Sequence, residues 1–134
     1  MSVVIVTHYR LGEEFLQALR LIVPDAPAFQ AVSIDPKQSV DEMREAIAAA
    51  LRSAEQGEGV LVLTDMFGGT PSNMALSFLD EHRVEIVTGL NLPMLIKLAS
   101  VRSSSKLPVA VIQAQEAGRK YINVASQLLA DAGS

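Results

Sequence analysis

The chain has 134 residues and no cysteine, with 49% hydrophobic residues, 19% charged residues and a formal net charge of −4. This composition is typical of an ordered globular protein and excludes a disulfide framework, a thiolate nucleophile and a metal site with cysteine ligands. The negative charge speaks against nucleic acid as a partner, and no apolar run approaches the ~18 residues that a membrane-spanning helix needs. The lack of cysteine suits the cytoplasm, where we expect the protein to act.

Strand patterns and helix patterns alternate along the chain. Continuous apolar runs predict strands covered on both faces, and apolar residues at helical spacing predict the helices between them. In chain order the predicted elements are a strand at 3–6, a helix from Leu11 to Ile22, a half-polar strand at 29–34, a helix that a Ser39–Glu42 capping box opens, a strand at 60–64, a short helix through Met74–Leu79, a strand at 84–88 and a helix that starts at Asn91–Pro93.

The C-terminal region gives two conflicting patterns. Val109, Ile112 and Ala117 have helical spacing, whereas Tyr121–Val124 alternates like a strand. A helix continued to Leu129 fits the same residues about as well. Periodicity leaves both structures open for this segment.

Alternating strands and helices with buried strands predict a parallel sheet covered by helices on both faces. Ligands of such sheets bind beyond the carboxyl ends of the strands, where the winding reverses. His8 follows the first predicted strand and Asp65 follows the third. If these strands are neighbours, His8 and Asp65 lie side by side at that edge.

A histidine beside a carboxylate is a recognised nucleophilic arrangement. At neutral pH one ring nitrogen carries a lone pair and the other a proton, and an adjacent carboxylate fixes the tautomer and stabilises the positive ring that forms when the free nitrogen attacks. Such a charge-assisted hydrogen bond contributes roughly 1.5–3 kcal/mol.

The residues after Asp65 have the features of an anion site. Gly68 and Gly69 allow backbone N–H groups to turn toward a ligand, and Thr70 is expected to cap a helix whose first residue is Pro71. A helix N-terminus attracts negative charge. A nucleophilic imidazole beside such a loop predicts a phosphohistidine site.

Simpler interpretations exist for each residue taken alone. A histidine after a strand is more often a hydrogen-bonded loop residue, Asp65 could merely cap a turn, and His82 is expected at a solvated helix end. The acidic pair Glu13–Glu14 suits the first turn of a helix. The expected meeting of two separate segments at one sheet edge favours the functional interpretation.

Three segments closely resemble the mannose-type enzyme IIA domain (EIIA) of the bacterial sugar phosphotransferase system (PTS). They are VIVTH at 4–8, LTDMFGGTPSN at 63–73 and VTGLNLPML at 87–95. The resemblance covers nearly the whole chain in the right order. It implies that His8 accepts a phosphoryl group from phospho-HPr and passes it to a IIB protein, that Asp65 hydrogen-bonds the ring, and that Thr70 lies beside the phosphoryl group.

The resemblance also sets expectations for the fold and the partners. We expect residues 1–134 to form one α/β domain, a doubly wound, mostly parallel sheet with strand order 2-1-3-4 and helices on both faces. Family members dimerise by exchanging a C-terminal strand, which would be Tyr121–Ser126 in a homodimer of this chain. Because the chain ends at Ser134, the IIB acceptor is expected to be a separate protein, and a IIC/IID permease would give the only, indirect link to a membrane. No cofactor or metal is expected, because the phosphoramidate donor is already activated.

One position departs from the family pattern, and two alternatives remain. The family has glycine after the histidine, where this chain has Tyr9 and Arg10. The phosphoryl donor subunit of dihydroxyacetone kinases also has a histidine after its first strand, but the GGTP and GLNLP blocks argue against it. A flavodoxin-like flavin carrier or receiver domain lacks support, because the loop after the first strand has neither the flavin-binding glycines and hydroxyls nor a receiver's acidic pair.

Overall fold

The computed structural model describes residues 1–80, 83–101 and 104–132 and contains one four-stranded parallel sheet. The strands are β1 (Ser2–His8), β2 (Gln30–Ile34), β3 (Val60–Thr64) and β4 (Val84–Thr88), and they lie in the order β2-β1-β3-β4. Every pairing is parallel. The predicted fold class and strand order are therefore confirmed.

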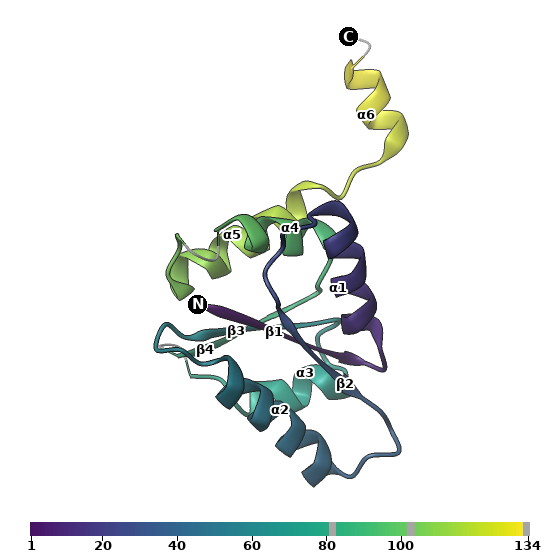
Figure 1. Ribbon diagram of the computed structural model, residues 1–134. Helices are drawn as coiled ribbons and strands as arrows, with labels where there is room; N and C mark the ends of the chain where they lie inside the picture. The colour runs from purple at the N-terminus through teal and green to yellow at the C-terminus, as the bar shows by residue number, and fades with distance from the viewer. Residues whose placement is uncertain (81–82, 102–103, 133–134) are drawn as a thin grey trace.

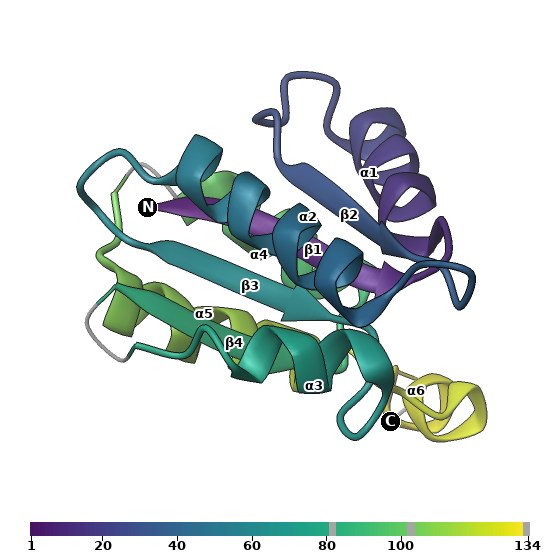
Figure 2. The same cartoon turned by 90° about the horizontal axis from the view of Figure 1, so that it is seen from below.

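Helices cover both faces of this sheet (Figures 1 and 2). Helices α1 (Leu11–Ile22), α4 (Leu92–Val101) and α5 (Leu107–Lys120) cover one face, and α2 (Val40–Ala54) and α3 (Thr70–Leu76) cover the other. Within the described part of the chain, no helix is both long and apolar enough to cross a membrane.

The side chains of the two central strands alternate between two hydrophobic cores. Ile5 of β1 packs with Leu19 of α1 and Leu95 of α4, whereas Val4 packs on the other face with Ile47 of α2. All five of these side chains are almost completely buried. Burial of each contributes about 1.5–3 kcal/mol to the stability of the fold, relative to an exposed position. Burial on both faces explains why the sequence of β1 is continuously apolar.

Local sequence signals fix several helix ends. Ser39 Oγ accepts a hydrogen bond from the Glu42 N–H at 3.1 Å, and Glu42 accepts one from the Ser39 N–H, so the predicted capping box is confirmed. Asn91 accepts from the Met94 N–H at 3.1 Å and donates to the Gly118 carbonyl at 2.9 Å. This amide therefore starts α4 and ties it to the end of α5.

The short helix after β3 differs from the prediction at both ends. Gly69 is the N-cap of α3, so Thr70 is its first residue and Pro71 its second, and no side chain caps the helix. The expected capping role of Thr70 is wrong by one position, because the extended backbone of Gly69 already supplies the cap conformation. The helix ends at Leu76, before Phe78 and Leu79, which follow in a turn.

The C-terminal segment has no strand in this structure. The chain leaves α5 at Lys120, continues without regular structure through 122–124 and forms α6 (Ala125–Ala132), which projects away from the sheet (Figure 1). The expected strand at Tyr121–Ser126 is absent from this single chain, because the segment pairs with no described strand, although Ile122 lines the groove beside the edge strand β4. The expected solvated position of His82 lies outside the described residues.

Candidate functional site

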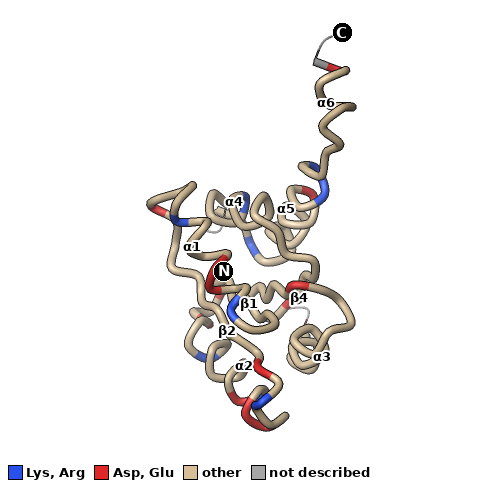
Figure 3. Tube along the Cα trace, turned by 90° about the vertical axis from the view of Figure 1, so that its right-hand side faces the viewer, with Lys and Arg blue, Asp and Glu red and all other residues tan. Residues whose placement is uncertain are grey.

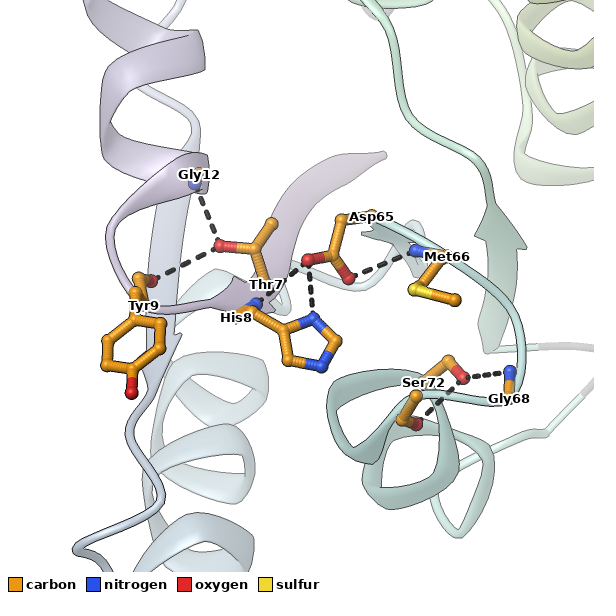
Figure 4. A network of polar contacts seen from close by, with 9 residues as sticks. Thr7, His8, Tyr9, Gly12, Asp65, Met66, Gly68 and Ser72 are labelled. Carbon is orange, nitrogen blue, oxygen red and sulfur yellow. Dashed lines mark hydrogen bonds and ion pairs between the residues drawn. The ribbon is translucent and has the colours of Figure 1, made fainter.

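The ends of β1 and β3 bring His8 and Asp65 together. The parallel register aligns Val6 with Thr64, so the residues that follow each strand emerge at the same edge of the sheet. Asp65 Oδ2 accepts a hydrogen bond from His8 Nδ1 at 2.7 Å and a second one from the His8 backbone N–H at 3.0 Å (Figure 4). The juxtaposition expected from the sequence is present.

The hydrogen bond assigns the roles of the two ring nitrogens. A carboxylate oxygen only accepts, so Nδ1 of His8 carries the proton and the neutral ring keeps its lone pair on Nε2. The His8 side chain retains 39% of its exposure, whereas that of Asp65 retains 12%. The structure thus combines a partly exposed imidazole with a largely buried carboxylate that orients it.

The surroundings of Asp65 keep its carboxyl ionised. Burial raises the pKa of this carboxyl, but hydrogen bonds from the His8 backbone and ring, together with one from the Met66 N–H at 3.0 Å, outweigh the burial and lower the pKa below its usual value. A carboxylate that is ionised at neutral pH is the state needed to stabilise a positively charged imidazole.

The double glycine packs against the histidine. A Cβ atom at Gly69 would lie 2.7 Å from Cε1 and 3.2 Å from Nε2 of His8, so the absence of a side chain lets the loop approach the ring. Gly68 has a φ of +87°, a left-handed conformation that favours glycine. The two glycines therefore have different roles: Gly69 provides space and Gly68 provides the turn.

Ser72 braces this loop and was not identified from the sequence. Its buried Oγ accepts a hydrogen bond from the Gly68 N–H at 3.0 Å and donates to the Gly69 carbonyl at 3.1 Å (Figure 4). The Gly68 N–H is thus occupied within the chain, while Thr70 stands exposed at the start of α3. The position of Ser72, three residues after the N-cap Gly69, is the one signal that could have indicated its role.

We expect Gly69→Ala to slow the chemistry of His8 by about tenfold or more, because a contact of 2.7 Å forces the ring or the loop to move. Since Gly69 has an ordinary φ of −82°, alanine adds no backbone strain and the clash alone is tested. Imidazole nitrogen NMR should show a changed His8 environment in a folded variant. An unaltered spectrum and an unaltered rate would contradict the close packing.

The turn that follows His8 is held by a second buried hydroxyl. Thr7 Oγ1 accepts a hydrogen bond from the Gly12 N–H at 2.8 Å and donates to the Tyr9 carbonyl at 3.4 Å. A Cβ at Gly12 would lie 3.0 Å from Ile5 Cγ2, so glycine lets the start of α1 approach the sheet. Thr7 and Gly12 therefore position the residues beside His8, and neither was assigned a role from the sequence.

Comparison with known proteins places this chain in a family. The family model described as "PTS system fructose IIA component" (EIIA-man) matches residues 2–115. The chain belongs to this EIIA family. The resemblance to mannose-type EIIA domains is confirmed, and this EIIA chain is a phosphotransferase component with a phosphoryl-carrier role in the PTS.

Individual relatives agree with the family assignment. The EIIA chain is 28% identical over 100 residues to the sorbose-specific EIIA component of Lacticaseibacillus casei, covering 74% of this chain and 72% of the relative. It is 27% identical over 124 residues to the mannose-specific EIIAB component of Escherichia coli K12, covering 91% of this chain but 38% of that longer protein. The solved mannose/sorbose IIA subunit of Enterococcus faecalis superposes with a TM-score of 0.82 at 27% identity, covering 92% of each chain.

Proposed function

We propose that this EIIA chain carries a phosphoryl group on Nε2 of His8, received from phospho-HPr and passed to a separate IIB protein. The observation that carries this proposal is the 2.7 Å hydrogen bond between His8 Nδ1 and Asp65, which directs the lone pair of the neutral ring to Nε2 on a partly exposed side chain. The names of the relatives, which are EIIA or EIIAB components, support the same role.

The proposed step is an in-line transfer between two histidines. The lone pair of His8 Nε2 forms a bond to phosphorus while the bond between phosphorus and the donor's ring nitrogen breaks, and the donor ring leaves with that electron pair. Both nitrogens of His8 then carry a substituent, so the ring becomes positive. Asp65, whose pKa is lowered, stabilises this charge through the Nδ1 proton.

The loop after Asp65 is the proposed holder of the phosphoryl oxygens. Gly69 lies against the His8 ring, and the N–H and hydroxyl of Thr70 follow it at the start of α3. First-turn N–H groups have no partner inside a helix. Because Ser72 engages the Gly68 N–H, we assign Gly68 a conformational role and Gly69 and Thr70 the contacts with phosphoryl oxygens.

We further propose that the chain acts in the cytoplasm as a homodimer, with any contact to a membrane made indirectly through a IIC/IID permease. Within the described part of the chain, β3 is the only strand that pairs with β4, and a groove of about 560 Å³ runs beside β4, between it and α5. The segment at 122–124 has no regular structure, and exposed apolar residues such as Ile122 and Leu129 follow α5. An unpaired edge beside such a segment suits exchange between two copies.

The experiment that tests the proposed function is a reconstituted relay. Incubation with phosphoenolpyruvate, enzyme I and HPr should place an acid-labile, alkali-stable phosphoryl group on the chain, and omission of HPr should prevent it. Failure to acquire that label from phospho-HPr would contradict the proposal. Transfer to candidate IIB proteins then identifies the acceptor.

A further inference from the structure

Tyr9 adopts a backbone conformation that is unfavourable for its residue type. It follows His8 directly and has a φ of +48°, the one left-handed non-glycine residue in the described part of the chain. Bulky residues rarely occupy this region, because the Cβ crowds the backbone, whereas glycine adopts it freely. Glycine would therefore suit this backbone position better than tyrosine. The backbone conformation gives no reason for the Tyr9 side chain, so its role must lie elsewhere.

The surrounding hydrogen bonds explain why the turn is left-handed. The Tyr9 N–H donates to the Ile34 carbonyl at 2.9 Å, and the Tyr9 carbonyl accepts from Thr7 Oγ1 at 3.4 Å. These contacts use backbone atoms of Tyr9 and none of its ring atoms. They fix the conformation whichever residue stands at this position.

Packing within the chain does not require the ring either. Tyr9 is 58% exposed, so its removal opens no cavity. Figure 4 shows the phenol ring and the imidazole of His8 projecting to the same side of the end of β1. The aromatic ring is thus displayed to solvent beside the nucleophile.

Exposed apolar side chains also follow the two strands that carry the site. Leu11 is 49% exposed at the start of α1, and Met66 and Phe67 are 55% and 70% exposed directly after Asp65. The neighbouring Arg10 is paired with Glu13 at 2.9 Å. We call Tyr9, Leu11, Met66 and Phe67 the apolar rim of the His8 site.

We propose that Tyr9 is a specificity-determining residue of the docking surface, and that its ring packs against apolar side chains around the phosphohistidine of the donor protein. This inference rests on the proposed function. An in-line transfer between two protein-borne imidazoles requires the donor surface to reach His8 Nε2, and the adjacent apolar rim must then lie in the interface. Exposed aromatic residues near the centre of an interface commonly dominate its binding energy.

Three variants separate the ring from the backbone conformation. Tyr9→Gly removes the ring and the unfavourable conformation, Tyr9→Ala removes the ring alone, and Tyr9→Phe keeps the ring without its hydroxyl. We expect Tyr9→Gly to melt at the same temperature as the unaltered chain or higher. The KM for phospho-HPr should rise on the order of tenfold in both Tyr9→Gly and Tyr9→Ala, with kcat little changed, and stay near its original value in Tyr9→Phe.

Leu21→Ala is the matched control, because Leu21 is 84% exposed in the last turn of α1, away from His8, and its loss should not change the KM. If the unaltered chain acquires the label but Tyr9→Gly and Tyr9→Ala keep the original KM, the docking role is wrong and the proposed function stands. A KM increase in Tyr9→Phe equal to that in Tyr9→Gly would contradict ring packing. If phospho-HPr does not label the unaltered chain at all, both proposals fail.

Discussion

His8→Ala should acquire no acid-labile phosphoryl group from phosphoenolpyruvate, enzyme I and HPr, whereas His82→Ala should be labelled like the unaltered chain. The chain contains two histidines, so this pair of variants tests both. His8 has a largely buried carboxylate on Nδ1 and a side chain that is 39% exposed, as the proposed transfer requires. Removing the nucleophile leaves no second route, so the loss should be complete rather than partial.

Circular dichroism and thermal melting should show that His8→Ala is folded, because the side chain is partly exposed and its main contacts are with Asp65. Equal labelling of His8→Ala and the unaltered chain would overturn the proposed phosphorylation site. Loss of label in His82→Ala alone would move the site to that histidine.

Asp65→Asn should preserve the fold but slow phosphoryl transfer to His8 on the order of 10²–10³-fold. Asparagine matches aspartate in shape but carries no charge, so it neither stabilises the positive ring nor favours the tautomer with the proton on Nδ1. Single-turnover labelling with phospho-HPr measures the rate directly. Asp35→Asn is a matched control, because Asp35 follows the neighbouring strand β2 and its Oδ1 accepts from the Lys37 N–H.

The lowered pKa of Asp65 gives this variant a second signature. A carboxyl whose pKa is lower in the folded state stabilises the fold at pH values above its unfolded-state pKa of about 3.9. This stabilisation disappears as the pH falls through the lower pKa of the folded state. The difference in unfolding free energy between the original chain and Asp65→Asn should therefore shrink between pH 5 and the acid limit of folding. A difference that grows on acidification, or a rate equal to that of Asp35→Asn, would contradict the assigned role.

Burial on both faces made the sheet predictable. The apolar runs of β1 and β3 have few alternatives in a short chain, and the alternation with helices determines parallel pairing. Since parallel strands end at one edge, the meeting of His8 and Asp65 followed from the topology. These predictions depended on patterns over many residues, which local irregularities do not alter.

The details that were missed depend on contacts between specific atoms. The N-cap of α3 moved from Thr70 to Gly69 because backbone conformation, rather than a hydroxyl, starts this helix. The bracing by Ser72 requires its side chain to fold back on one amide and one carbonyl group of the loop. The left-handed conformation of Tyr9 is imposed by contacts with β2 and Thr7, and the residue type gives no hint of it.

The C-terminal segment shows a different limit. Tyr121–Val124 alternates like a strand, and Leu128 and Leu129 lie at positions that also suit a helix. In the structure the latter part is α6, a helix with one charged residue, Asp131, that extends from the body of the molecule (Figure 3). Neither pattern determines the structure of a segment that has few contacts with its own chain.

The most direct test of the proposed mechanism is the position of the phosphoryl group on the histidine ring. Phosphorus and nitrogen NMR of the chain, labelled with ¹⁵N-histidine and phosphorylated by phospho-HPr, distinguishes the two nitrogens through their coupling to phosphorus. We predict phosphorylation of His8 at Nε2, with the Nδ1 proton retained and bonded to Asp65. Phosphorylation at Nδ1, or at a residue other than His8, would contradict the account.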